Sequence, residues 1–341
     1  MSEPPEAHSS DIQTAIARLH LKNNLIGYRN LLSYANALNV RIFPTTKINR
    51  HLWVSKGSGT YSEVFETRLD SEPSREVIIK RPNASFTRDD ERVENLVQHQ
   101  ALSNIIQEVR ILTHPDLNCH DNLIRIFGIY LEEEDNPVGT RPCIVFEKAL
   151  MTFSTYLRDN SVHLSQDSVI TFLADVAAGL SAIHAHGLVH GDLKPDNVLM
   201  VLRHGRLTCA LADFGTSGTS GQSVEEYGII PGTPGFRAPE NYESSGFHHW
   251  VNKPARDVYG LGLIVFSIVT NDRAPPFPSD SEKLQHDDVA CLAFLRRRII
   301  QTPPMELPWD IIQHCVLANP EARSSLTFIR CLLRKAQGLD G

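Results

Sequence analysis

The sequence predicts an α+β fold in which a small, strand-rich part is followed by a larger, mainly helical part. Five short runs typical of β-strands lie between residues 51 and 147, and a long helical stretch, Arg88–Thr113, interrupts them. From about Met151 the pattern is mainly helical, with turn-rich interruptions. Strands segregated from helices along one chain indicate the α+β class. The 341 residues are enough for two lobes and a sizeable core.

The five expected strands follow one another closely. Residues 52–69, LWVSKGSGTYSEVFETRL, predict two strands around a turn that contains glycine, and residues 75–80, REVIIK, predict the third. Residues 123–131 and 142–147 predict the last two strands. The acidic segment between those two, EEEDNPVGT, predicts a loop.

Residues 1–50 are expected to form an N-terminal extension. The first ten residues, rich in Ser, Glu and Pro, predict a disordered tail. Apolar residues at helical spacing then predict two helices, one over residues 12–19 and one over residues 25–38, before Pro44. We expect these helices to pack against the lobe that follows. The alternative is a docking role for a regulatory partner.

The composition is that of an ordinary globular protein. The net charge of −7 gives no reason to expect nucleic acid or an anionic membrane as a partner, because both favour basic proteins. The longest apolar stretch, Leu261–Thr270, is shorter than the roughly 20 residues of a membrane span. The six cysteines include no C-x-x-C pair, and the first residues are acidic and polar. These features favour a reducing compartment, so we expect a cytoplasmic or nuclear protein.

Two features of the strand-rich part suggest phosphate binding. In KGSGTYSEV, Lys56–Val64, the residues Gly57 and Gly59 let backbone amides approach a phosphate, because no Cβ stands in the way. A hairpin turn with two glycines explains this motif alone equally well. Lys80 ends a strand of buried type, and its charge needs an anionic partner. Phosphate oxygens would serve, with Glu108 of the predicted helix holding the ammonium group.

The most specific segment is HGDLKPDNVL, His190–Leu199. It places Asp192, Lys194 and Asn197 in one short loop, bracketed by apolar side chains. Transfer of a phosphoryl group needs these three chemical groups: a carboxylate near the attacking hydroxyl, a cation near the γ-phosphate and an oxygen ligand for magnesium. The tight order of the motif argues against an ordinary polar surface loop.

Three further motifs follow in order. Asp213 begins DFG after an apolar run, where its carboxylate suits a metal ligand. Residues 232–240 read GTPGFRAPE, and residues 257–270 read DVYGLGLIVFSIVT. Arg323, in NPEARSSL, is expected to be a buried partner for Glu240. Each motif alone could occur by chance, but their order and spacing together could not.

Taken together, these motifs resemble those of eukaryotic protein kinases over residues 51–338. The resemblance implies a bilobal fold with a small lobe over residues 51–147 and a large lobe over residues 148–338. It also implies ATP and Mg²⁺ as cofactors and a protein substrate. Asp192 would be the catalytic base and Lys194 would neutralise the γ-phosphate, while Lys80 pairs with Glu108. Asn197 and Asp213 would bind the metal.

The same resemblance implies a nucleotide site. Phe146 matches the gatekeeper, Glu147 and Ala149 match the hinge, and Leu199 lies beneath the adenine. The expected nucleotide-binding residues are Lys56, Gly57, Ser58, Gly59, Thr60, Ser62, Val64, Ile78, Lys80, Phe146, Glu147, Ala149 and Leu199.

Substrate class and regulation follow from single positions. Lys194 stands where tyrosine kinases usually have arginine or alanine, and Thr233 matches a threonine that contacts the lysine and the aspartate. Both favour serine/threonine substrates. Gly191 replaces the arginine that usually receives an activation-segment phosphate, so we expect that phosphorylation not to be required. Ile78 replaces a usual alanine, and together with the bulky Phe146 it predicts a tight nucleotide pocket.

Other interpretations remain open at this stage. A pseudokinase would use the same fold as a binding or scaffold module, although such proteins usually lose one of the four catalytic or metal-binding positions kept here. A small-molecule phosphotransferase shares the H-G-D loop but typically lacks the A-P-E segment, residues 238–240. A purely structural module would make the catalytic set a coincidence. Glu94 is the alternative partner for Lys80.

Overall fold

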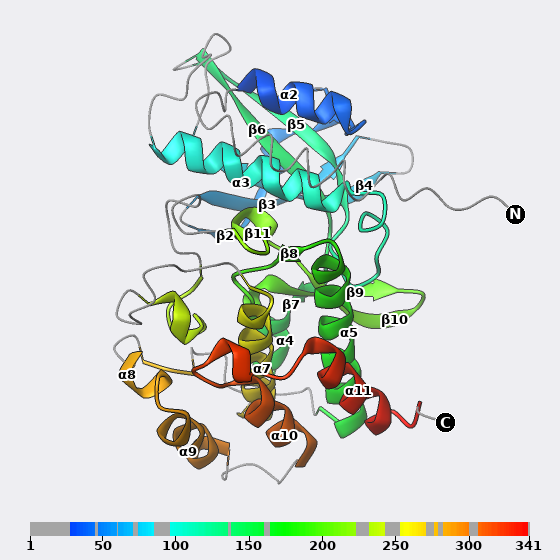
Figure 1. Cartoon of the computed structure of the whole chain (residues 1–341). Helices are drawn as coiled ribbons and strands as arrows, with labels where there is room; N and C mark the ends of the chain where they lie inside the picture. The colour runs from blue at the N-terminus through cyan, green and yellow to red at the C-terminus, as the bar shows by residue number, and fades with distance from the viewer. Residues whose placement is uncertain are drawn as a thin grey trace, which may run out of the picture. The chain divides into compact units, whose positions relative to one another are not determined.

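The computed structural model of the chain describes residues 28–44, 47–59, 61–70, 74–84, 96–135, 138–159, 164–222, 232–242, 253–270, 276–278, 282–299 and 306–339. The chain divides into two compact units. The first comprises Met1–His114 and Arg125–Lys148, and the second comprises Pro115–Ile124 and Ala149–Gly341. The first unit is rich in strands and the second in helices (Figure 1), which confirms the predicted α+β class.

A short segment before residue 125 belongs to the second unit, although it lies inside the range expected for the small lobe. The reason is backbone pairing. The amide of Ile124 donates to the carbonyl oxygen of Leu211 at 2.9 Å, and Leu123 forms a bridge with Leu211. These bonds tie the segment to a strand far along the chain, which no local pattern in the sequence reveals.

The first unit contains a six-stranded sheet with the order β1-β5-β6-β4-β3-β2. All five predicted strands are present, and the extension adds a sixth, β1. The strands are β1 (Ile42–Phe43), β2 (Val54–Ser58), β3 (Ser62–Leu69), β4 (Arg75–Pro82), β5 (Ile126–Asp135) and β6 (Val138–Glu147).

The predicted loop over residues 132–140 is wrong, because most of it is strand. β5 continues to Asp135 and β6 begins at Val138, with Glu132 opposite Arg141. The Glu132 side chain is fully buried, and its carboxylate lies 2.6 Å from Nε of Arg81 and 2.7 Å from Nη2 of Arg50. These ion pairs allow an acidic residue inside a sheet. The acidic composition of residues 132–140 had instead favoured a loop.

The N-terminal extension is an integral part of this unit. β1 pairs in parallel with β5, and the amide of Ile129 donates to the carbonyl oxygen of Arg41 at 2.8 Å. Gly128 has φ +153°, and a Cβ built there would lie 2.1 Å from the Arg41 oxygen. Glycine at this position therefore permits the close approach of the extension.

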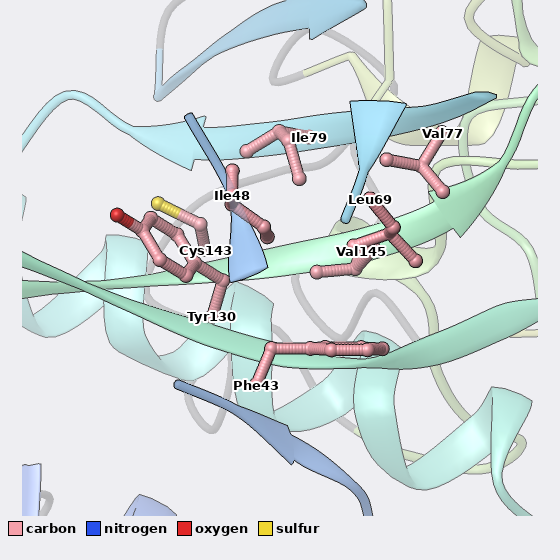
Figure 2. Packing of buried hydrophobic residues seen from close by; sticks show 8 residues of the cluster. All are labelled: Phe43, Ile48, Leu69, Val77, Ile79, Tyr130, Cys143 and Val145. Carbon is pink, nitrogen blue, oxygen red and sulfur yellow. The ribbon is translucent and has the colours of Figure 1, made fainter. Parts of the chain in front are cut away.

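Residues of the extension also cover one face of the sheet. Figure 2 shows Phe43 and Ile48 of the extension pointing toward side chains of the sheet strands. A cluster of buried, mostly apolar side chains lies on this face of the sheet, and we call this face the cluster face. Its buried members are Phe43, Ile48, Leu69, Val77, Ile79, Tyr130, Cys143 and Val145.

Within the described part of the first unit there are two helices, α2 (Tyr28–Ala37) and α3 (Leu96–Leu112). They contact each other (Figure 1), and Leu31 and Ala35 of α2 are fully buried. The second predicted helix of the extension is thus confirmed as a packed element. The predicted tail, the first predicted helix, the start of the long helix before Leu96 and the residues Glu94 and Thr60 lie outside the described residues.

The second unit is mainly helical. Among its described residues, one helix, α5 (Gln166–Ala185), is long and apolar enough to cross a membrane by length and composition alone, yet 56% of its apolar window is buried inside the protein. Its strands are β7 (Met151–Thr152), β8 (Leu188–Val189), β9 (Val198–Arg203), β10 (Arg206–Leu211) and β11 (Gly218–Thr219). The helices among its described residues are α4 (Phe153–Arg158), α5 (Gln166–Ala185), α7 (Ala255–Thr270), α8 (Glu282–Gln285), α9 (Asp288–Ile299), α10 (Glu306–Cys315) and α11 (Leu326–Ala336).

Helix α7 forms the core of this unit, because most of its side chains are buried. Two glycines let other segments approach it. A Cβ at Gly260 would lie 2.9 Å from Cβ of Leu193, and one at Gly262 would lie 2.6 Å from Cβ of Cys315. The first contact brings the loop that carries Asp192 directly against α7.

Candidate active site

The first unit contains an ion pair between β4 and α3. Nζ of Lys80 lies 2.7 Å from Oε2 of Glu108, as the sequence predicted. The Glu108 side chain is only 2% exposed, whereas that of Lys80 is 19% exposed. The buried carboxylate therefore holds the ammonium group in one place, and the lysine is the partner that an anionic ligand can reach.

The glycine-containing motif forms the β2–β3 hairpin. Gly57 lies opposite Val64, and the amide of Gly59 donates to the carbonyl oxygen of Ser62 at 2.7 Å. Among the described residues, a Cβ at Gly57 would meet no atom within 4 Å, and one at Gly59 would lie 3.6 Å from the Ser62 oxygen. The packing of the protein itself does not require glycine at either position, whereas a phosphate close to the backbone would.

The residues expected to contact a base lie on the strands next to Lys80. Ile78 is directly opposite Phe146 in β4 and β6, and the Phe146 side chain is buried. Glu147 bonds to Arg125 twice: its amide donates to the Arg125 oxygen, and its carboxylate accepts from the Arg125 amide. These bonds fix the backbone at the end of β6.

The other expected nucleotide contacts are more dispersed. The side chain of Lys56 forms an ion pair with Glu66 at 2.6 Å and is half-exposed. Ser58 is exposed at the end of β2. In the second unit, Ala149 is half-buried and Leu199 lies on β9, opposite Ala210.

In the second unit, three polar side chains contact the carboxylate of Asp192 and form a network with it. Oδ2 of Asp192 lies 2.8 Å from Nζ of Lys194 and 3.1 Å from Nδ2 of Asn197, and Oδ1 accepts from the Thr233 hydroxyl at 2.8 Å. The Lys194 ammonium also donates to the Thr233 hydroxyl. Lysine, aspartate and threonine are therefore in mutual contact, as the sequence predicted for Thr233. The network holds the carboxylate in one orientation.

Two side chains of this unit offer oxygen atoms that suit a hard divalent cation. Nδ2 of Asn197 donates both to the backbone oxygen of Asp192, at 2.7 Å, and to its carboxylate, which leaves the amide oxygen of Asn197 as the acceptor end. Asp213 adds a carboxylate. Its backbone is left-handed, with φ 63° and ψ 65°, a conformation that is uncommon for a residue other than glycine and clusters at functional sites. An amide oxygen and a carboxylate are ligands that Mg²⁺ accepts.

Asp257 of α7 anchors the start of the loop over residues 190–199. Its carboxylate accepts from the amides of His190 and Gly191, at 2.8 and 2.9 Å, and from Nε2 of His184 at 2.8 Å. Burial by itself would raise the pKa of Asp257. The hydrogen bond and charge of His184, the charge of His190 and the Gly191 amide outweigh it, so the pKa is below its ordinary value.

One contact of this loop was not found from the sequence. Nη2 of Arg256 donates to the carbonyl oxygen of Gly191 at 2.9 Å, and the Arg256 side chain is buried. Gly191 has φ +83°, and a Cβ there would approach the Thr216 oxygen and the Arg256 guanidinium. Glycine thus suits both the backbone and the neighbouring arginine. The only sequence signal was an arginine directly before Asp257.

The expected ion pair between Glu240 and Arg323 is present and buried. The two guanidinium nitrogens contact the two carboxylate oxygens at 2.7 and 2.6 Å, an arrangement with two parallel hydrogen bonds. The same guanidinium donates to the carbonyl oxygens of Leu317, Ala255 and Ala318. It therefore ties the A-P-E segment to the start of α7 and to the C-terminal region.

Comparisons with known proteins agree with these motifs. The family model of the protein kinase domain matches residues 53–337. Serine/threonine-protein kinase PkaA of Streptomyces coelicolor is 32% identical over 50% of this chain and 29% of its own length. Serine/threonine-protein kinase GRIK2 of Arabidopsis thaliana is 28% identical over 82% of this chain and 63% of its own. The cyclin-dependent kinase 4 homolog of Caenorhabditis elegans is 23% identical over 84% and 65%. The matched region thus spans less than two thirds of each relative.

Proposed function

The chain belongs to the protein kinase domain family, and from this premise we propose that it is an active serine/threonine protein kinase. The proposed reaction transfers the γ-phosphoryl group of Mg-ATP to a hydroxyl group of a protein substrate. The observation that carries the proposal is the network in which Lys194, Asn197 and Thr233 all contact the Asp192 carboxylate.

In this reaction Asp192 accepts the proton of the attacking hydroxyl. The hydroxyl oxygen forms a new bond to the γ-phosphorus, the bond from that phosphorus to the bridging oxygen of the β-phosphate breaks, and ADP leaves. Lys194 contacts the same carboxylate, and its ammonium group would neutralise charge on the γ-phosphate. Thr233 orients both groups through its hydroxyl.

The nucleotide and metal would be held by the residues described above. Lys80, fixed by Glu108, would bind the α- and β-phosphates, and the amides around Gly57 and Gly59 would approach them. Asn197 and Asp213 would hold Mg²⁺, which supplies neutralisation of phosphate charge when bound. Each of these roles is a proposal supported by geometry and by the family resemblance.

The preference for serine and threonine rests on the contacts of Thr233. Its hydroxyl links Asp192 with Lys194, and the relatives of this chain include proteins named serine/threonine kinases. A pseudokinase, acting as a binding or scaffold module, is the alternative that the test below distinguishes.

The test is transfer of radiolabelled phosphate from Mg-ATP to a generic protein substrate, with phosphoamino-acid analysis, for wild type and Asp192→Asn. We expect label on serine or threonine and a loss of about 10²–10⁴-fold in rate for the variant, because a positioned general base contributes that much. Asp196→Asn is the matched control, since Asp196 is exposed in the same loop and makes no described side-chain contact with the network.

A folded wild type that transfers no phosphate with either magnesium or manganese would support the pseudokinase alternative. Label on tyrosine would overturn the substrate class. An equal loss in Asp192→Asn and Asp196→Asn would show that the loop, and not the Asp192 carboxylate, is what the substitution damages.

A further inference from the structure

A cavity of about 520 Å³ lies beside the cluster of Figure 2 in the first unit, and it shares Phe43 and Leu69 with that cluster. Val77 and Ile79 of β4 belong to the same cluster, whereas Ile78 and Lys80 alternate with them and point to the opposite face of the sheet. The cavity is therefore separate from the Lys80–Glu108 pair. Its remaining lining residues are Arg41, Lys47, Asp70, Ser74, Arg75 and Phe127.

The lining carries an excess of positive charge. Among the described lining residues, Arg41, Lys47 and Arg75 are cations and Asp70 is an anion, which leaves these residues with a formal charge of +2. The whole chain, by contrast, has a net charge of −7. The positive charge is thus a local feature of this cavity and not a consequence of a basic protein.

These three cations also differ from other basic side chains of the first unit in whether they pair with a carboxylate. Within the described residues, none of the three forms an ion pair with a carboxylate. Several other basic side chains of this unit pair with neighbouring carboxylates: Lys56 and Lys148 with Glu66, Arg68 with Glu76, and Arg81 with Glu63 and Glu132.

Two of the three cations are instead held over aromatic rings. The guanidinium carbon of Arg41 lies 4.7 Å from the ring centroid of Phe43, and that of Arg75 lies 4.0 Å from that of Phe127. Stacking occupies one face of a guanidinium group and leaves its N–H edges for another acceptor. Such edges form paired hydrogen bonds with phosphate oxygens, and their fixed orientation reduces the entropy that binding would cost.

We propose that this cavity is a docking site for a phosphorylated serine or threonine of a partner protein, with a neighbouring apolar side chain against Phe43, Phe127 and Leu69. A phosphate monoester carries about −1.5 to −2 charges at pH 7, which matches the formal +2 of the cavity. A single carboxylate would leave about half of that charge uncompensated. The exposed rim and the apolar wall together suit a peptide better than a free ion.

The test measures peptide binding to the full chain by fluorescence anisotropy, without ATP. The probe is a labelled peptide pool, degenerate except for a central phosphoserine followed by leucine. Matched pools carry serine or glutamate at the central position. We expect the phosphoserine pool to bind at least about tenfold more tightly than either matched pool. Without nucleotide, this result does not depend on whether the protein transfers phosphate.

Charge-removing variants locate the site. We expect Arg41→Gln/Lys47→Gln/Arg75→Gln to lose at least about tenfold in affinity for the phosphoserine pool, and Arg75→Gln alone to lose part of it. Arg68→Gln is the matched control, because Arg68 is an exposed arginine of the same sheet that pairs with Glu76. Thermal unfolding of each variant checks the fold, and phosphate-transfer rates of the variants should match the wild type.

Four outcomes would overturn the proposal. One is equal binding of the phosphoserine and serine pools up to about 1 mM, a concentration that corresponds to very weak binding. The second is equal binding of the glutamate pool, which would make this a site for acidic peptides. The third is unchanged phosphoserine binding in the triple variant. The fourth is competition by inorganic phosphate at the same concentration as the peptide pool, which would show a site for the free anion.

Discussion

The loop over residues 190–199 in the second unit and the cluster face of the first unit are held in place by different kinds of interaction. The loop is oriented by buried polar contacts, above all those of Asp257 with the amides of His190 and Gly191. The cluster face is held by apolar packing that many side chains share. A buried polar group has few alternative partners, whereas packing is distributed, so single substitutions should have larger effects around the loop.

The largest effect on stability is expected for Arg323→Ala. The substitution leaves the Glu240 carboxylate buried without its guanidinium partner, which costs about 3–5 kcal/mol in measured cases. Urea unfolding of the full chain measures it. Lys253→Ala is the control, because Lys253 forms its ion pair with Glu321 at the surface and should change stability little. Similar losses of stability in the two variants would contradict the larger contribution that we assign to the buried ion pair.

A smaller effect with a pH signature is expected for Asp257→Asn. The pKa of Asp257 is lower in the folded protein than its ordinary value of 3.8. Its contribution to stability is therefore complete above about pH 4 and is lost as the pH falls through the lower, folded value. At neutral pH the variant should lose about 1–3 kcal/mol, because His184 and two backbone amides lose a charged acceptor.

This pH signature distinguishes charge from packing. Unfolding of Asp257→Asn and wild type, measured between neutral and acidic pH, should show a difference that shrinks below pH 4. If the difference in unfolding free energy stayed constant with pH, the negative charge of Asp257 would contribute nothing to stability.

The smallest loss of stability is expected for Gly128→Ala, a substitution next to Phe43 of the cluster face. The added Cβ would meet the Arg41 oxygen at 2.1 Å, so the short strand β1 must move away. Overpacking typically costs about 1–3 kcal/mol, and we expect the low end because only a two-residue strand needs to detach. Hydrogen exchange at the Ile129 amide, which donates to Arg41, should become faster.

Gly205→Ala is the matched control for this variant. Gly205 also has a positive φ, but a Cβ there would meet no atom of the described residues within 4 Å. If Gly205→Ala destabilised the protein as much as Gly128→Ala, backbone strain and not the close approach of the extension would explain the loss.

Much of the candidate site could be predicted from short stretches of sequence. Asp192, Lys194 and Asn197 lie in one loop, so their order alone indicated a phosphoryl-transfer network. The pairing of Lys80 with Glu108, 28 positions apart, was predicted because a lysine at the end of a buried strand needs an anionic partner and Glu108 lies on the predicted helix. The acidic segment after residue 131 was misread, since its composition gave no sign that Arg81 and Arg50 neutralise the buried Glu132.

The sequence by itself determined the fold class, the family and the local order of the catalytic groups, because strand and helix periodicity and short motifs act over neighbouring residues. Only the tertiary structure decided that Arg256 supports Gly191, that the extension completes the sheet and that Arg41, Lys47 and Arg75 meet at one cavity. Gly191 and Arg256 are 65 positions apart, and the extension pairs with a strand more than 80 positions further along the chain. Long-range strand pairing and burial bring them together, and no local pattern records which distant partners will meet.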